Sequence, residues 1–242
     1  KWPKDIKMTK DLIFRNKQPA NLKNLIEGAG CFFIGSGPSL GYLDLNQLKE
    51  RGILTFAVNN IAAYSNIRPN FWCSCDEPNS FHNVIWADPG IIKFIRTNNA
   101  EKIKQHPNLY TFDINEDFKA ETFFTEPTIC FGNHSNLVDE YGNKGGRSVM
   151  YPAVRIMHYL GIKRIYFIGC DFNMEKGKEY VFDENKWEGG IKTNNQNYEL
   201  MNTRFKALAV EGKKHGLSFF NCSPNSKLTA FDRLDFDIAI QK

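Results

Sequence analysis

Short apolar runs alternate with amphipathic stretches along the chain. Apolar runs bounded by Gly, Pro and polar residues are typical of strands buried on both faces of a sheet. They predict strands over residues 31–34, 54–58, 71–75, 109–112, 128–131, 164–169 and 217–223. Apolar residues at helical spacing predict helices over residues 21–27, 43–51, 91–96, 148–160 and 198–214. This alternation predicts an α/β fold with a mostly parallel sheet and helices on both faces.

One long segment, residues 173–197, is polar, carries aromatic residues and lacks apolar periodicity. A structureless span of that length in a compact domain is usually a binding loop or a lid. We therefore predict a long polar, lid-like loop there. The chain shows no internal repeat and no linker, so we expect an N-terminal extension over residues 1–30 and a single domain over residues 31–242.

Charge and cysteine content limit the function classes. The 31 basic and 27 acidic residues leave a formal charge of +4, which is too small to indicate nucleic-acid binding by itself but suits a small anionic ligand. No apolar run reaches the roughly 20 residues that cross a bilayer, so we expect no transmembrane segment. Six cysteines, several of them in apolar runs, predict free thiols in a reducing compartment. We expect a cytoplasmic protein and leave peripheral association with a membrane open.

The first polar loop, Gly35-Ser36-Gly37-Pro38-Ser39, directly follows an apolar run. In open α/β sheets, ligands bind at the carboxyl ends of the strands. Glycines let the backbone approach a phosphate and point N–H groups toward it, and Pro38 and Ser39 can begin or cap the next helix. The loop lacks the Walker sequence and the full Gly-x-Gly-x-x-Gly fingerprint. Spacing alone therefore leaves nucleotide binding and a simple turn equally open.

Two further loops follow the next predicted strands. Asn59 and Asn60 come after the strand at residues 54–58, where paired amides can read a base or a ribose, or can cap a helix. Asp76 ends the strand at residues 71–75, where a carboxylate can bind a metal ion or a substrate hydroxyl, or can cap the next turn.

A fourth polar loop precedes the predicted helix at residues 148–160. It carries Lys144, Gly146, Arg147 and Ser148. A helix N-terminus offers free N–H groups and the positive end of the helix dipole, which together bind anions. After the first loop, this segment is the best candidate for a phosphate site.

Polar residues also follow the last two predicted strands of the sheet. Asp171 ends the strand at residues 164–169, and Tyr180, farther along, can donate to a phosphate, stack on a base or pack the loop. Pro224, Asn225 and Ser226 form a polar turn after the closing strand.

Taken in order, these loops resemble a known superfamily. The stretches FIGSGPSL, AVNN, FWCSCDEP, GGRSVMYPA and LGIKRIYFIGCDFNMEKGKEYVFD resemble the archaeal 6-hydroxymethylpterin diphosphokinase family, whose core also occurs in the flagellin-modifying motility-associated factors. The stretch NTRFKALAVEGKKHGLSFFNCSPNS is similar to bacterial sialyltransferases that use cytidine-monophosphate sialic acid. The resemblance spans residues 31–231, most of the chain.

The resemblance implies a Rossmann-like, nucleotide-binding transferase domain. It implies a nucleotide lying across the first glycine loop, the Asn59–Asn60 loop and the turn at residues 224–226. In the sialyltransferases, tyrosines contact the departing phosphate, and Tyr180 matches one of them. Their catalytic base is a histidine, and Glu199 occupies its place in this chain.

The first hypothesis is a glycosyltransferase that uses a nucleotide-sugar donor, with a cytidine monophosphate type favoured, and an unidentified acceptor hydroxyl. Lys144, Arg147 and Tyr180 would stabilise charge on the departing phosphate, and Glu199 or a loop histidine would deprotonate the acceptor. This reaction would require no metal ion. The resembling enzymes often assemble, so a homo-oligomer is an open expectation.

Two alternatives remain. A diphosphokinase would transfer diphosphate from ATP to a pterin-like alcohol and would need Mg²⁺, for which Asp76 and Asp171 are the candidate ligands. A non-catalytic nucleotide-binding module would be favoured if having Glu199 in place of the expected histidine abolishes the reaction.

Overall fold

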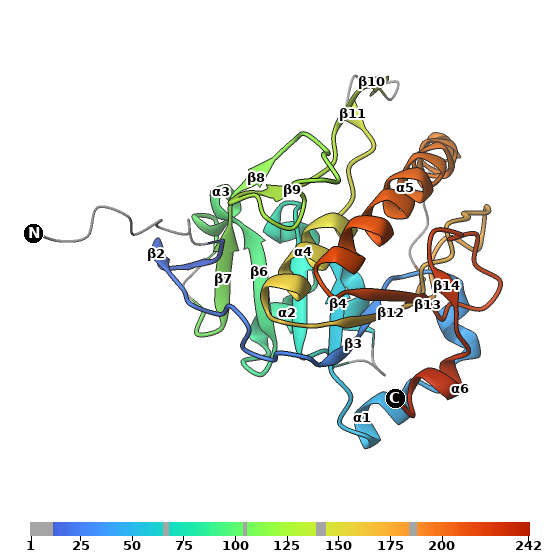
Figure 1. The fold of residues 1–242 in the computed structure, drawn as a ribbon, viewed down its shortest axis with the longest axis horizontal. Coiled ribbons are helices and arrows are strands. Elements are labelled where there is room, and N and C mark those ends of the chain that lie inside the picture. Colours follow the sequence, from blue (N-terminus) through green and yellow to red (C-terminus); the bar gives the residue numbers. More distant parts are fainter. Residues whose placement is uncertain (1–11, 65–67, 104–105, 139–143, 184–187) are drawn as a thin grey trace, which may run out of the picture.

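The computed structural model describes residues 12–64, 68–103, 106–138, 144–183 and 188–242. Within these residues, ten strands form one sheet (Figure 1). In sheet order they are β14 (Asp232–Arg233), β13 (Ser218–Asn221), β12 (Arg164–Ile168), β3 (Gly30–Ile34), β4 (Thr55–Val58), β5 (Phe71–Ser74), β6 (Ile92–Arg96), β7 (Leu109–Phe112), β1 (Phe14–Arg15) and β2 (Gln18–Pro19). The strands from β14 to β7 are parallel, and β1 and β2 extend the sheet antiparallel. The predicted mostly parallel α/β fold is confirmed.

Helices cover both faces of this sheet (Figure 1). Successive side chains of β3 alternate between the two cores, since Phe33 packs with α4 and α5 while Phe32 packs with α1, α2 and α6. The helices, with η marking a 3-10 helix, are η1 (Pro38–Tyr42), α1 (Asn46–Glu50), η2 (Asn59–Ala63), η3 (Pro78–Ser80), α2 (Asn83–Ala87), α3 (Thr97–Ala100), α4 (Met150–Tyr159), α5 (Glu188–Lys214) and α6 (Phe236–Ala239). Every helix in the described part of the chain is too short or too polar to span a bilayer.

Two small pairs of strands lie outside the main sheet. Strand β8 (Ile114–Asn115) pairs in parallel with β9 (Ile129–Cys130), so the strand predicted over residues 128–131 is shorter and peripheral. Strand β10 (His134–Val138) pairs antiparallel with β11 (Lys144–Gly145). All six cysteines are buried free thiols, as predicted.

Two predicted helices are wrong. Residues 91–96 form the interior strand β6, which pairs with both β5 and β7, because a short apolar run suits a strand as well as a helix. Lys93, within this strand, is fully buried. Residues 21–27 form turns, and Gly161 packs against this segment closely enough that a Cβ at Gly161 would meet the backbone of Glu27.

The predicted loop over residues 173–197 is also too long. Helix α5 begins at Glu188, so residues 188–197 are helical, and the described loop covers residues 173–183. Polar residues on this part of α5 line a cavity instead of packing into the core, which removes the apolar periodicity that a helix prediction needs. The division at residue 30 stays a prediction, although Leu12 and Ile13 are buried against the main core.

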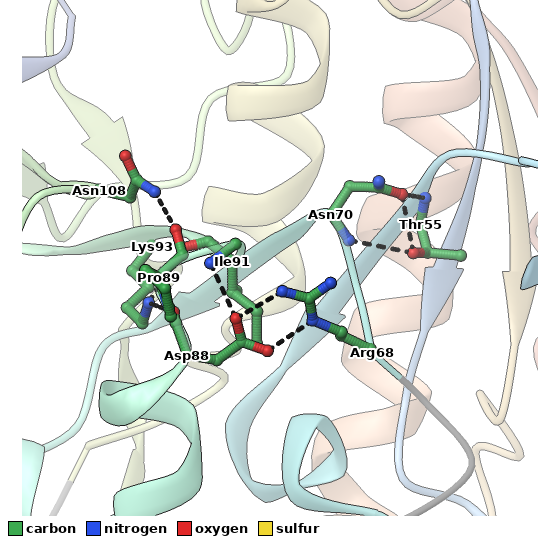
Figure 2. A network of polar contacts seen from close by, with 9 residues as sticks. Thr55, Arg68, Asn70, Asp88, Pro89, Ile91, Lys93 and Asn108 are labelled. Atoms are coloured by element: carbon green, nitrogen blue, oxygen red, sulfur yellow. Dashed lines mark hydrogen bonds and ion pairs between the residues drawn. The ribbon is translucent and has the colours of Figure 1, made fainter.

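A polar network connects residues at the amino-terminal ends of β5 and β6 (Figure 2). Arg68 donates two hydrogen bonds to the carboxylate of Asp88, at 2.6 and 2.8 Å, and the Gly90 N–H donates a third at 2.8 Å. The ammonium of Lys93 donates to the carbonyls of Asp88 and Ile91, at 2.6 and 2.9 Å. Burial lowers the pKa of Lys93 to about 8. The network therefore ties the loop before β6 to the strand itself.

Replacing Asp88 by Asn should destabilise the protein at neutral pH. The hydrogen bonds from Arg68 lower the pKa of Asp88 to about 2, so its stabilising effect is present above about pH 4 and is lost as the pH falls toward 2. Because Arg68 is largely exposed, we expect a loss of about 1–2 kcal/mol in urea unfolding at pH 7, and a smaller loss at pH 3. Glu77→Gln, which breaks an exposed pair with Lys102, is the control and should change stability by less than about 1 kcal/mol. Equal effects of the two variants at pH 7 would contradict the assignment.

Candidate functional site

A cavity of about 440 Å³ lies where the carboxyl ends of β3, β4, β5 and β12 meet. The chain adds strands outward from β3 to β7 on one side of the sheet, and later from β12 to β14 on the other. The strand order therefore reverses between β3 and β12, which is the position where open α/β sheets bind ligands. The first half of α5 also lines this cavity.

The glycine loop after β3 is packed tightly against the loop after β12. The N–H groups of Gly35 and Gly37 donate to the carbonyls of Ile168 and Gly169, at 2.9 and 2.8 Å. A Cβ at Gly37 would lie 2.6 Å from the carboxylate carbon of Asp171, and one at Gly35 would collide with Gly169. The glycines are therefore required by loop packing, and their N–H groups are already used.

Ser36 is the residue of this loop that remains available to a ligand. It lines the cavity, and no described residue accepts a hydrogen bond from its N–H or its hydroxyl. The Ser36 carbonyl accepts from the N–H of Val181 at 2.9 Å, which fixes the peptide plane. We expected several N–H groups of this loop to face a phosphate. Of the three N–H groups of Gly35, Ser36 and Gly37, that of Ser36 remains available.

Ser39 and Asp171 clamp the two loops together. The Ser39 N–H donates to Asp171 Oδ2 at 2.9 Å, and the Ser39 hydroxyl donates to Oδ1. Burial raises the pKa of Asp171, and the two bonds from Ser39 partly offset that rise. Pro38 occupies the first turn of η1, as predicted, but the Ser39 side chain binds Asp171 instead of capping the helix.

Amides fix the first half of α5 over the cavity. Asn197 Oδ1 accepts from the N–H of Gly146 at 2.9 Å. Asn195 bonds both the N–H and the carbonyl of Met174, each at 2.9 Å. The ring of Tyr198 stacks on Phe172 with 5.0 Å between centroids. The loops at 146 and 172–174 and the helix therefore form one connected wall.

Two cavity-lining residues have left-handed backbone conformations without being glycine. Asn59 and Phe172 both have φ of 52°. The Asn59 carbonyl accepts from the indole N–H of Trp72 at 2.8 Å, which holds the turn after β4 in place. Strained backbone of this kind often occurs at functional sites, where the surrounding structure enforces it.

The charged side chains lining the cavity are mostly acidic. Among the described residues they are Asp76, Asp171, Glu179 and a single cation, Arg147. Asp76 and Arg147 are exposed, whereas Glu179 is only 5% exposed. The site as described is therefore not a preformed basic pocket for a polyphosphate.

Half of the residues predicted for the site line the cavity together. They are Gly35, Ser36, Gly37, Asn59, Asp76, Arg147, Ser148, Asp171 and Tyr180. They come from loops after β3, β4, β5 and β12 and from the segment before α4, as expected from the carboxyl ends of parallel strands.

Other predicted residues lie outside the lining. Glu199 is exposed and lies off the face of α5 that lines the cavity, so the geometry gives no support to its role as base, which stays a prediction. The Asn60 amide bonds the backbone of Ser80 and His82 instead. The side chain of Lys144 lies outside the described residues.

Two further groups of predicted residues do not line the cavity but contact segments that do or that adjoin it. The Gly146 carbonyl accepts from the buried Arg204, at 3.0 Å. The turn Pro224, Asn225 and Ser226 contacts the segment after β12, where the Ser226 hydroxyl donates to the carbonyl of Cys170 at 2.6 Å. The Asp171 carbonyl accepts from the N–H of Lys227 at 2.7 Å, so this turn positions the strand end that carries Asp171.

Sequence reasoning missed the polar face of α5 and Glu179. The face consists of Thr193, Asn194, Asn197 and Tyr198, which recur at helical spacing in a run that lacks apolar residues. A search for polar residues at spacings of three and four would have found it. Nothing in the sequence separates Glu179 from the charged residues around it.

A protein-family model matches most of the chain. The model of a family described as 6-hydroxymethylpterin diphosphokinase MptE-like matches residues 8–177. The match includes the glycine loop, β12 and Asp171, and ends before Glu179 and α5. None of the curated proteins searched matches the chain.

Ser39→Ala should lower stability more than Ser36→Ala. Removing the Ser39 hydroxyl leaves Asp171 Oδ1 without its partner in a half-buried position, so we expect a loss of about 1–3 kcal/mol in urea unfolding. Ser36→Ala removes a hydroxyl without a described partner and should change stability by less than about 0.5 kcal/mol. A Ser39→Ala protein as stable as Ser36→Ala would show that the clamp does not hold the loops.

Proposed function

Because the chain belongs to the 6-hydroxymethylpterin diphosphokinase MptE-like family, we propose that it transfers a diphosphoryl group from ATP to the hydroxyl of a small alcohol. The observation that carries this proposal is the cavity at the β3–β12 reversal, whose described charged lining is three carboxylates and one arginine. An acidic cavity accepts a polyphosphate only when a cation neutralises part of the charge.

The size and polarity of the cavity suit a nucleotide. A volume of about 440 Å³ lies in the range of small-molecule sites. Ser36 offers an N–H and a hydroxyl to a phosphate. The amides of Asn59, Asn194 and Asn197 also line the cavity, and one group of each has a protein partner: Asn59 Oδ1 accepts from Ser74, Asn194 Nδ2 donates to the sulfur of Met174, and Asn197 Oδ1 accepts from Gly146. The opposite group of each amide can bind a base or a ribose.

The donor set fits Mg²⁺. The side chains that could bind a metal ion here are mostly oxygen donors, and Asp76 and Asp171 are the carboxylates at the strand ends. The described residues contain no cluster of three His, Cys, Asp or Glu able to hold a metal ion alone. Mg²⁺ commonly uses one or two carboxylates together with substrate phosphates, so it does not need such a cluster. When bound, Mg²⁺ would neutralise phosphate charge and orient the triphosphate.

The reaction requires one displacement at phosphorus. The acceptor oxygen forms a bond to the β-phosphorus of ATP, and the bond from that phosphorus to the oxygen bridging the α-phosphate breaks. AMP leaves, and the acceptor proton passes to a base. Arg147 and Tyr180 line the cavity and would stabilise negative charge on the phosphates.

A second candidate function is glycosyl transfer from a nucleotide sugar, with a cytidine monophosphate donor favoured. The observation that favours it is that Tyr180, the match to a phosphate-contacting tyrosine in the resembling sialyltransferases, lines the cavity. The exposed position of Glu199 argues against it, since no base then stands at the expected place. Homo-oligomer formation and a cytoplasmic location stay predictions.

Thermal-shift measurements with ATP, ADP, CMP, CDP, UDP and GDP, each with and without Mg²⁺, test the proposal. ATP with Mg²⁺ at about 100 times its Kd should raise the melting temperature by roughly 5–10 °C, and ATP alone should raise it much less. Incubation of ATP and Mg²⁺ with 6-hydroxymethylpterin should then release AMP.

Three other results would contradict diphosphoryl transfer. A shift by CMP without metal would favour glycosyl transfer. ATP binding without AMP release would favour a non-catalytic module. No shift by any nucleotide at millimolar concentration would overturn nucleotide binding altogether.

A further inference from the structure

Glu179 is a buried carboxylate that the fold leaves without a partner. It is 5% exposed and lines the cavity. No described residue donates a hydrogen bond to it or forms an ion pair with it. Its oxygens are also not among the fully buried polar atoms of the described residues that lack a hydrogen-bond partner. Its carboxylate therefore faces the space of the cavity.

The backbone holds Glu179 in place from both sides. The Lys178 N–H donates to the Glu175 carbonyl at 3.0 Å, which closes a turn immediately before it. The Val181 N–H donates to the Ser36 carbonyl at 2.9 Å, which anchors the segment after it to the glycine loop. The position of Glu179 relative to the candidate phosphate site at Ser36 is therefore fixed.

An ionised carboxylate removed from water is costly unless a ligand or a side chain pairs with it. Phosphate oxygens would repel it, and the other acidic side chains of the described lining, Asp76 and Asp171, supply no positive charge to pair with it. Arg147, the described cation of the lining, is exposed. An uncharged ligand group satisfies a carboxylate by donating a hydrogen bond, and the acceptor hydroxyl of the proposed reaction is such a donor.

We propose that Glu179 binds the acceptor hydroxyl and removes its proton as the general base, an inference that rests on the proposed function. The acceptor O–H proton moves to a carboxylate oxygen of Glu179 while the acceptor oxygen bonds to the β-phosphorus. The bond between that phosphorus and the bridging oxygen breaks, and AMP leaves with the electron pair. For glycosyl transfer the sequence analysis gave Glu199 or a loop histidine as the base; for diphosphoryl transfer it named none.

The test compares Glu179→Gln with Glu175→Gln. Both variants remove one negative charge from the same loop, but Glu175 is exposed and its carboxylate accepts a hydrogen bond from the Asn173 amide at 2.9 Å. Binding of ATP with Mg²⁺ is measured by calorimetry. Release of AMP is measured with 6-hydroxymethylpterin as acceptor and, separately, with water alone.

We expect Glu179→Gln to lower the rate of AMP release about 10²- to 10⁴-fold while ATP affinity changes less than about twofold. Because Gln and Glu are nearly isosteric and no described residue pairs with the carboxylate, the ligand-free variant should melt close to the wild-type temperature. Glu175→Gln should match the wild type in all three measurements.

The other outcomes overturn the assignment. Full turnover by Glu179→Gln would show that it is not the base. A loss of ATP affinity as large as the loss of rate would place Glu179 in the nucleotide or metal site instead. A lower melting temperature without ligand would show that Glu179 has a structural partner. If wild-type protein binds ATP but releases no AMP with either acceptor, or binds no nucleotide, the proposed function fails and the base assignment fails with it.

Discussion

The close contact between the loops after β3 and β12 determines the rest of the site. Two backbone hydrogen bonds and the Ser39–Asp171 clamp join these loops at the point where the strand order reverses. A side chain at Gly35 or Gly37 would not fit this contact. Because both glycine N–H groups are used here, the loop presents Ser36 to the cavity, and the second loop carries Asp171 and the left-handed Phe172 to its rim.

The polar groups at the two ends of the parallel strands differ in how completely they are paired. At the amino-terminal edge, Arg68, Asp88 and Lys93 form a network in which each charged group has a partner (Figure 2). At the carboxyl-terminal edge, Glu179 has no described partner and Asp171 is held by a neutral serine alone. Buried polar groups left incompletely paired in this way are stabilised when a ligand supplies the missing partner, whereas the paired network has nothing to gain from one.

The sequence predicts the fold and about a third of the cavity lining for the same physical reason. Apolar runs buried on both faces identify the central strands, and parallel strands bring the loops after them to one edge, so Gly35, Asp76 and Asp171 meet as expected. Residues 91–96 were misassigned because a short apolar run suits a strand as well as a helix, and the pairing of β6 with β5 and β7 depends on residues outside the segment. The role of the glycines was misjudged because it depends on Gly169, which is more than a hundred residues away in the chain.

The first turns of α5, which the sequence analysis took for a loop, line the cavity. The matched family segment ends at residue 177, so it contains the strand ends and Asp171 but neither Glu179 nor the amide face of α5. A nucleotide makes the same demands in many transferases, whereas an acceptor differs from one enzyme to the next. Asn195 and Asn197 fix the amide-bearing face of α5 to the loops beneath it. Amides in fixed positions can select between acceptors by hydrogen bonding, since a polar group that the wrong acceptor leaves unpaired is costly. Under the proposed function, we therefore expect acceptor specificity to depend on the part of the cavity that residues beyond 177 line.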